Sequence, residues 1–276
     1  MPIRQGREEG ETAMSVSIHD LAAYKARGEK FVMLTAYDFP TAQILDEAGV
    51  PVLLVGDSLA QVVLGYDTTI PVSVDEMLHH TRAVSRGARN SLIVGDMPFG
   101  TYGGTVERGI ENAIRFMKEG GAHAVKFEGP QMDLVEQLSK IGVPVMAHLG
   151  LTPQSVHLFG GYKVQGRSEE QADNIVRWAK ELEEAGAFSL VLECVPSDLA
   201  ARITRGLSIP TIGIGAGPDC DAQVLVINDL LGMTPGKPPK FVKRYANLRE
   251  EISHAARTYA DQVKRGEYPG PEHSYS

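Results

Sequence analysis

The chain has 276 residues, of which 43% are hydrophobic and 22% are charged, the ordinary proportions of a water-soluble globular protein. Its formal net charge of −8, with no run of lysines and arginines, argues against a nucleic acid or a membrane surface as partner. No stretch approaches the roughly 20 apolar residues that a membrane-spanning helix needs.

The N-terminal segment 1–17 is polar, contains glycine and lacks the apolar core of a signal peptide. We interpret it as a disordered leader, within which Met14 is an alternative start. Residues 18–276 are expected to form a single domain, because no change in composition marks a boundary. The two cysteines, Cys194 and Cys220, form neither a C-x-x-C motif nor a disulfide framework, so a reducing, cytoplasmic location is expected.

Short apolar segments alternate with helical patterns along the rest of the chain, and their runs of Val, Leu and Ile are typical of strands covered on both faces. The predicted strands are Phe31–Ala36, Val52–Gly56, Leu92–Gly95, His123–Glu128, Val143–His148, Ser189–Glu193, Thr211–Ile214 and Val224–Ile227. Capping-box patterns at Ser73–Glu76 and Ser168–Gln171 predict two helix starts, and Gly186 is placed where the second of these helices ends.

About eight strands alternating with helices predict an α/β fold, a (β/α)₈ TIM barrel. The main alternative is a doubly wound open sheet, which usually has a glycine-rich phosphate turn after its first strand. Here that turn, residues 35–40, contains no glycine, which favours the barrel. Residues 241–265 are predicted to form a C-terminal helical extension packed on the outside or on another subunit.

Four of the apolar runs end in an acid, namely Asp57, Asp96, Glu128 and Glu193. In a barrel all strand C-termini open on one face, so these acids are expected to converge there. The structural alternative for the two aspartates is a helix N-cap. Carboxylates on one rim, with neither a cysteine nor a histidine pair, indicate a magnesium site. Such a site suits a small oxygen-rich substrate, for example a 2-oxo acid.

Other side chains at the same rim have candidate roles. Lys126 and Glu128 are two residues apart on a strand and point to the same side, so they form either an internal ion pair or part of a site. Lys126 could oppose the charge of a carboxylate or an enolate. Glu193 is a candidate general base, with a solvated or ion-paired acid as the alternative. His148 ends the fifth strand and is either a site residue or a satisfied polar side chain.

Two loops at this end of the predicted barrel are candidates for a functional role. The glycine-rich turn 213–217 follows a strand and is either a phosphate cradle or a tight turn that needs positive φ angles. The connection 149–167 is long and rich in Gly, Pro, Ser and Gln, which is typical of a functional lid.

With these residues in place, the chain resembles the ketopantoate hydroxymethyltransferase family. The matching segments run in the family's order from about residue 18 to the C-terminus. They are Leu34–Asp38, Leu54–Ser58, Asp96–Phe99, Val125–Gly129, His148–Val156, Gly160–Arg167, Leu192–Pro196, Gly213–Gly217 and Glu272–Ser274.

The resemblance implies a barrel of the phosphoenolpyruvate/pyruvate type that assembles as a homodecamer. It implies transfer of a hydroxymethyl group from methylene-tetrahydrofolate to 3-methyl-2-oxobutanoate, which forms 2-dehydropantoate for pantothenate and coenzyme A synthesis.

The resemblance also implies roles for individual residues. The residues Asp57 and Asp96 would bind Mg²⁺ directly, and Glu128 would join through water or weak coordination. The substrate would lie on the metal, near the backbone of Ser58 and near Lys126 and His148. Glu193 would accept the proton from the substrate C3.

Two alternatives remain at this point. One is a magnesium-dependent lyase or mutase of the same barrel class, but such enzymes carry a catalytic cysteine after the fourth strand, where this chain has Gly129–Asp133. The other is a non-catalytic barrel that binds a metal–oxoacid complex, in which Glu193 would have no task.

Overall fold

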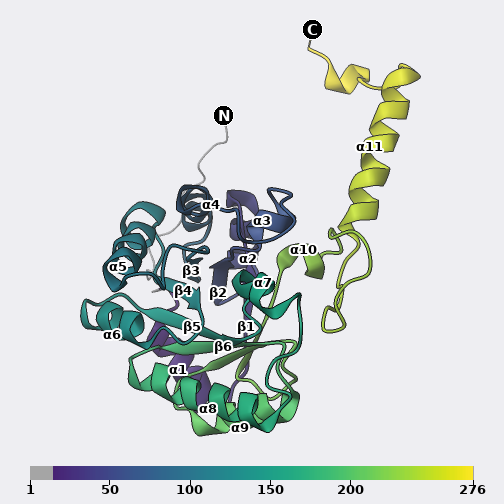
Figure 1. The fold of residues 1–276 in the computed structure, drawn as a ribbon. Coiled ribbons are helices and arrows are strands. Elements are labelled where there is room, and N and C mark those ends of the chain that lie inside the picture. The colour runs from purple at the N-terminus through teal and green to yellow at the C-terminus, as the bar shows by residue number, and fades with distance from the viewer. Residues whose placement is uncertain (1–14, 276) are drawn as a thin grey trace.

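The computed structural model describes residues 15–275, which include a closed barrel of parallel strands surrounded by helices (Figure 1). Neighbouring strands follow chain order, and β8 closes the barrel by pairing with β1. The strands are β1 Phe31–Thr35, β2 Val52–Val55, β3 Leu92–Asp96, β4 Ala124–Glu128, β5 Val145–Gly150, β6 Ser189–Glu193, β7 Thr211–Ile214 and β8 Ala222–Leu225. The predicted eight-stranded barrel is confirmed.

Helices lie outside the strands and connect most of them, whereas β7 and β8 are joined by the short turn 215–221 (Figure 1). The helices are α1 Ile18–Ala26, α2 Phe39–Glu47, α3 Leu59–Val62, α4 Val74–Gly87, α5 Val106–Arg115, α6 Met132–Lys140, α7 Val156–Phe159, α8 Glu169–Glu184, α9 Ser197–Gly206, α10 Ile227–Leu230 and α11 Leu248–Lys264. A π-helical turn, Phe116–Gly120, extends α5, and short 3₁₀ turns occur at Pro153–Ser155 and Pro271–His273.

Some strand ends differ from the prediction by one or two residues. Strand β5 begins at Val145 rather than Val143, because the Val143 N–H donates to the Leu138 carbonyl and still belongs to the turn that closes α6. Strand β8 begins and ends two residues earlier than predicted, since its pairing with β1 sets its register. Strand β3 continues through Asp96, whose partner across the sheet is Lys126.

The predicted helix ends agree with the structure. The Ser73 hydroxyl accepts from the Glu76 N–H at 3.3 Å and the Glu76 carboxylate accepts from the Ser73 N–H at 2.8 Å, which confirms the capping box of α4. The Ser168 hydroxyl accepts from the Gln171 N–H at 3.2 Å, which is the first half of such a box at α8. Gly186 follows α8 with a φ of +104°, as a helix-ending glycine does.

Apolar side chains fill the barrel interior toward the N-terminal ends of the strands. This inner cluster includes Met33, Val94, Met146 and Ile212, together with Leu21 of α1. Because apolar residues occupy that half of the barrel, the charged residues of the strands are left at the C-terminal end, where active sites of such barrels lie.

A second apolar layer lies between the strands and the outer helices and includes Val125 and Phe127 of β4. Phe116 belongs to the same layer and packs against β3 at Gly95, where an added Cβ would clash with the phenyl ring. The glycine therefore allows an aromatic ring to contact the strand directly before Asp96.

Helix α11 lies within the predicted C-terminal extension and leaves the barrel (Figure 1). None of its residues is buried within the described chain, and Ile252 and Tyr259 are 55% and 57% exposed. The helix therefore presents large apolar side chains to its surroundings.

Of the predicted leader, residues 1–14 lie outside the described residues, and with them the alternative start Met14. The Val16 N–H donates to the Asn90 carbonyl at 2.6 Å, and the Ser17 hydroxyl caps α1. The last residues of that segment therefore take part in the fold. Among the described helices, none has the length and apolar character to cross a membrane.

Candidate active site

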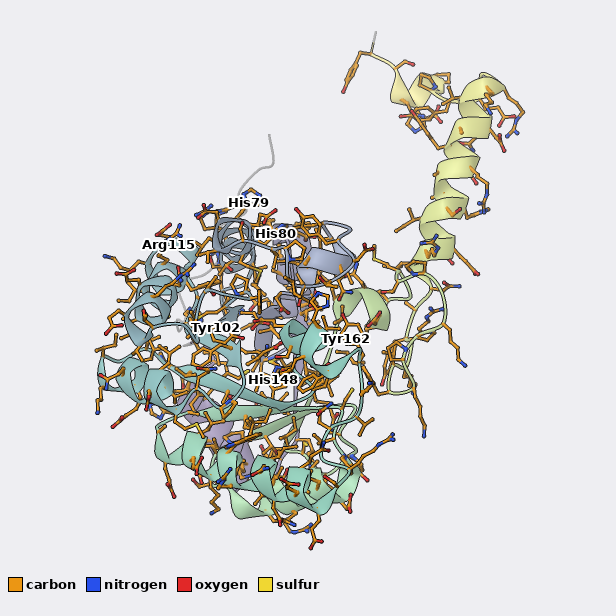
Figure 2. All side chains as sticks on the ribbon, viewed as in Figure 1. His79, His80, Tyr102, Arg115, His148 and Tyr162 are labelled. Carbon is orange, nitrogen blue, oxygen red and sulfur yellow. The ribbon has the colours of Figure 1, made fainter. Side chains whose placement is uncertain are left out.

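The site residues predicted from the sequence line a single cavity at the C-terminal end of the barrel, with a volume of about 530 Å³. They are Asp57, Ser58, Asp96, Lys126, Glu128, His148 and Glu193. Each lies on a strand or directly after one, so the parallel arrangement brings them together. Figure 2 labels His148 near the centre of the barrel.

Asp96 and Lys126 form a buried ion pair between neighbouring strands. The register of β3 with β4 places the two residues side by side, and the Lys126 Nζ lies 2.8 and 2.9 Å from the two carboxylate oxygens of Asp96. Lys126 thus pairs with the neighbouring strand rather than with Glu128 on its own strand, which corrects the internal pair considered from the sequence.

Asp57 and Asp96 are adjacent, and neither is the N-cap of a described helix. The Asp57 N–H donates to Asp96 Oδ2 at 3.2 Å. Asp96 lies inside β3, and the cap position of α3 is held by Ser58, whose hydroxyl lies 2.9 Å from the Tyr37 hydroxyl. The helix-cap alternative is therefore wrong for both aspartates.

Burial dominates the electrostatics of this cluster. It raises the pKa of Asp96 to about 7, against the opposing charge of Lys126. Burial and then the negative charge of Asp57 raise the pKa of Glu128 well above its usual value. Burial lowers the pKa of Lys126, but Asp96 and the other acids outweigh it, so the net pKa is raised and the side chain is an ammonium. Acids held in such proximity favour a further cation.

His148 lies between two acids. Its Nδ1 is 3.7 Å from Glu128 Oε1, and its Nε2 is 3.4 Å from Glu193 Oε2. Burial and then the charge of Lys126 lower the pKa of His148 well below its usual value, so the ring is neutral. Burial raises the pKa of Glu193 to about 7, with Lys126 opposing the shift. A carboxyl group with this pKa can both accept and release a proton near neutral pH.

Two further residues, which the sequence did not single out, hold the acids in place. The Gln154 amide nitrogen donates to Asp57 Oδ2 at 2.9 Å, and the Gln154 backbone N–H donates to Glu128 Oε2 at 3.1 Å. The Tyr102 hydroxyl donates to Gln154 Oε1 at 2.6 Å and accepts from the Glu128 N–H at 3.1 Å. Gln154 is buried and therefore fixes the distance between the two carboxylates.

The acids fit a magnesium ion. Among the described residues, no three His, Cys, Asp or Glu side chains form a ready-made metal site, but Mg²⁺ usually keeps several waters and takes only one or two protein carboxylates. Asp57 and Asp96 could supply these. In the described chain Glu128 Oε1 and both ring nitrogens of His148 are buried without a hydrogen-bond partner. Such atoms are normally satisfied, which indicates a further polar ligand here.

The glycine-rich turn after β7 serves packing. Gly215 and Gly217 have φ angles of +62° and +81°. A Cβ on Gly215 would lie 2.9 Å from the Phe241 ring, and one on Gly217 would lie 2.5 Å from the Ser197 Cβ. The glycines therefore allow the turn to pack closely against Ser197 and against Phe241, which lines the cavity. These contacts and the positive φ angles support the tight-turn interpretation.

The long connection predicted as a lid forms one wall of the cavity. It contains α7, and Tyr162, Lys163 and Val164 follow this helix and line the cavity. Figure 2 labels Tyr102 and Tyr162 on either side of the barrel mouth in this view. The Gln165 N–H donates to the Cys194 carbonyl at 2.9 Å, which ties the loop to the end of β6.

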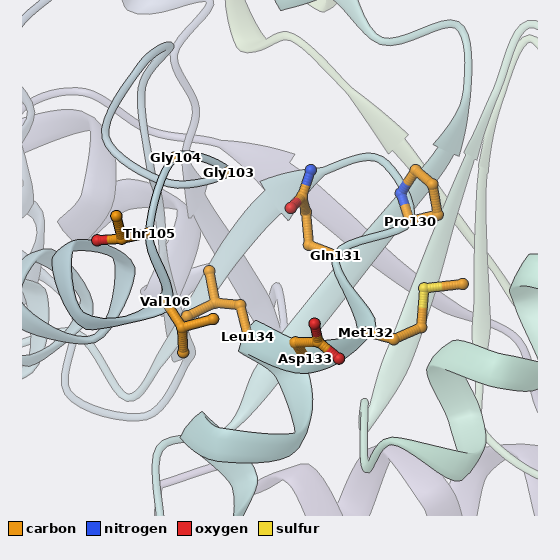
Figure 3. Close-up of a pocket in the computed structure, with 9 residues that line it drawn as sticks. All are labelled: Gly103, Gly104, Thr105, Val106, Pro130, Gln131, Met132, Asp133 and Leu134. Atoms are coloured by element: carbon orange, nitrogen blue, oxygen red, sulfur yellow. The ribbon is translucent and has the colours of Figure 1, made fainter.

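A separate cavity of about 360 Å³ lies between segment 103–106, which leads into α5, and segment 130–134, which leads into α6 (Figure 3). The second segment follows β4, the position at which lyases and mutases of this barrel class were expected to carry a cysteine. Its side chains in Figure 3 include Gln131 and Met132. This segment contributes no thiol to the described structure.

Comparison with known proteins gives a consistent result over nearly the whole chain. Residues 15–271 match the family model described as "Ketopantoate hydroxymethyltransferase". A 3-methyl-2-oxobutanoate hydroxymethyltransferase from Thermobifida fusca (strain YX) is 57% identical over 97% of this chain and 96% of its own length. The protein of the same name from Syntrophus aciditrophicus (strain SB) is 57% identical over 91% of this chain and 93% of its own length.

Among solved structures, a phosphonopyruvate hydrolase complex with oxalate and Mg⁺⁺ is similar with a TM-score of 0.61 and 13% identity, over 94% of this chain and 93% of that one. A 2,3-dimethylmalate lyase of the PEP mutase/isocitrate lyase superfamily has a TM-score of 0.57 and 15% identity, over 95% of this chain and 93% of that one. At this identity the likeness concerns the fold alone, and it agrees with the predicted (β/α)₈ barrel.

Proposed function

Because the chain belongs to the ketopantoate hydroxymethyltransferase family, we propose that it transfers a hydroxymethyl group from methylene-tetrahydrofolate to 3-methyl-2-oxobutanoate. The product is 2-dehydropantoate, an intermediate for pantothenate and coenzyme A. The names, identities and coverage of the relatives support this reaction.

One observation supports the chemistry most directly. A carboxyl group with a pKa of about 7 and a buried ammonium group line the same cavity, Glu193 at the end of β6 and Lys126 on β4. Removing a proton next to a carbonyl requires a base and a positive charge for the enolate oxygen. The barrel mouth supplies both.

We propose that Asp57 and Asp96 would bind Mg²⁺ directly and that Glu128 would join through water or weak coordination. The ion, when bound, acts as a Lewis acid on the substrate's keto oxygen. The buried positions of these acids and the unpartnered Glu128 Oε1 support the assignment.

Residues of the protein bind the substrate and move its proton. Lys126, His148 and the backbone of Ser58 bind and orient the carboxylate and keto group of the substrate. Glu193 then takes the proton from C3, and the electron pair of that C–H bond moves toward the keto oxygen, where Lys126 compensates the negative charge. The resulting carbon nucleophile forms a C–C bond with the methylene carbon, whose two C–N bonds to the folate break. One water supplies the hydroxyl oxygen of the product, and tetrahydrofolate is released with its nitrogens protonated.

Product formation tests the proposal against the lyase and mutase alternative. The protein with Mg²⁺ is incubated with methylene-tetrahydrofolate and 3-methyl-2-oxobutanoate, and separately with phosphonopyruvate and 2-methylisocitrate. We expect 2-dehydropantoate from the first mixture and neither cleavage nor rearrangement in the others. Cleavage or rearrangement of either acid, without 2-dehydropantoate, would contradict the proposal.

Assembly and location are part of the same proposal. The exposed Ile252 and Tyr259 on α11 support a homo-oligomer, for which we propose a decamer. Cys194 and Cys220 are both free, which supports a reducing, cytoplasmic location.

A further inference from the structure

The active-site cavity has an inner part and an outer part. The inner part holds the buried acids and Lys126. Two segments far apart in the sequence form the outer part: Tyr162, Lys163 and Val164 after α7, and Pro239, Lys240 and Phe241 after α10. Tyr162 is 54% exposed, so this part opens toward solvent.

The cavity is larger than a small oxoacid needs. Its volume of about 530 Å³ is that of a pocket for a drug-sized molecule. The transferred methylene carbon must come within bonding distance of the substrate C3, so both reactants must share this cavity. A folate whose reactive end lies beside the acids extends its other end through the outer part.

The outer part offers surfaces that suit a conjugated ring system. Tyr162 and Phe241 contribute aromatic faces, and Phe241 is held against the Gly215 turn. Thr69 and Thr234 also line the cavity, and within the described chain their hydroxyl oxygens are buried without a hydrogen-bond partner. Unpartnered buried hydroxyls are uncommon, and a polar ligand would satisfy them.

The charges in the outer part are mainly positive. Lys163 and Lys240 line it from opposite segments, and neither forms an ion pair with a described residue, while Asp229 is an acid of the same wall. Two free ammonium groups at the mouth of an otherwise acidic protein suit a negatively charged ligand. We infer that Lys163 and Lys240 bind the glutamate carboxylates of the folate tail, an inference that rests on the proposed function.

The test uses the full-length protein with Mg²⁺ and methylene-tetrahydrofolate carrying either one glutamate or three. The variants are Lys163→Glu, Lys240→Glu and the double variant, and the matched control is Lys237→Glu, an exposed lysine of the same segment that does not line the cavity. We expect each Lys→Glu charge reversal to raise KM for the folate about fivefold, which corresponds to the loss of one exposed ion pair. The parent should prefer the triglutamate, and the double variant should lose that preference.

A second readout separates this inference from the proposed function. Exchange of the C3 proton of 3-methyl-2-oxobutanoate with solvent requires no folate, so it should be unchanged in all these variants. Unchanged KM values with intact exchange would overturn the lysine assignment and leave the reaction in place. Loss of exchange in the variants would place the lysines at the oxoacid and also overturn the inference. Absence of exchange in the parent would overturn the proposed function, and the inference with it.

Discussion

With Glu193 as the proposed base, its burial would set the pH range of the reaction. Burial raises its pKa from 4.5 to about 7, and the protonated carboxyl group is far too weak a base to take a proton from carbon. The folate-independent exchange rate at C3 should therefore rise with pH and reach half of its maximum near pH 7. Nuclear magnetic resonance of the oxoacid in deuterated buffers measures this profile. A half-maximum near pH 4.5 would show that the base is not a buried carboxyl group.

Gln154 is a positioning residue, because its contacts join Asp57 and Glu128. Gln154→Ala should lower the affinity for Mg²⁺ by about tenfold, in the range seen when a residue that orients a metal ligand is lost. Calorimetric titration with Mg²⁺ measures the change, and Gln137→Ala, an exposed glutamine of α6, is the matched control. A titration of Gln154→Ala that coincides with that of the parent would exclude the positioning role.

The position of β3 depends on Gly95, against which Phe116 packs. Gly95→Ala should lower the free energy of unfolding by about 1–3 kcal/mol, because the added methyl group overpacks a filled core. Urea unfolding measures the loss, and Gly206→Ala is the control, since its added Cβ would have its nearest neighbour at 4.0 Å.

A double variant tests whether the Phe116 ring is the reason that Gly95→Ala destabilises the protein. Phe116→Leu combined with Gly95→Ala should cost less than the sum of the two single changes, because the smaller side chain makes room. Strict additivity would mean that the contact with Phe116 is not what requires the glycine.

The strands could be predicted because each is covered on both faces and appears as a continuous apolar run. The strand ends were predicted less accurately, because pairing with the neighbouring strand determines where a strand begins and ends. Strand β8, for example, begins at Ala222 rather than Val224, because Ala222 pairs with Phe31 of β1. The structural alternative for Lys126, an ion pair with Glu128, named the wrong acid for the same reason. The alternation of side chains along β4 indicates Glu128 as the neighbour of Lys126, whereas the register of β4 with β3 places Asp96 beside it.

The acids of the site were predictable from their place at strand ends, which a parallel barrel gathers on one face. Gln154 and Tyr102 were not, because they lie in a short 3₁₀ turn and in a loop, where no periodicity indicates the direction of a side chain. Gln154 does belong to a segment shared with the family, His148–Val156, which was the available signal.

In the described chain, α11 is a long helix without a buried residue, so it is the element that we propose to contribute to assembly. If it contributes to assembly, the parent should sediment as a multiple of 29.9 kDa, and Ile252→Glu with Tyr259→Glu should reduce that mass, because charges would be buried in the contact. Gln262→Glu on the same helix is the control. A parent that sediments at 29.9 kDa would contradict the proposed oligomer.

In the proposed reaction, Glu193 removes a proton from C3 of the oxoacid at the open end of the barrel. Exchange of that proton with deuterium, in the presence of Mg²⁺ and without folate, measures this step in the parent, in Glu193→Gln and in Glu184→Gln as an exposed control. The parent and the control should exchange at equal rates, and the rate in Glu193→Gln should fall at least about 100-fold while it still binds metal and oxoacid. Full exchange in Glu193→Gln, or none in the folded, metal-loaded parent, would contradict the role of Glu193 as the base.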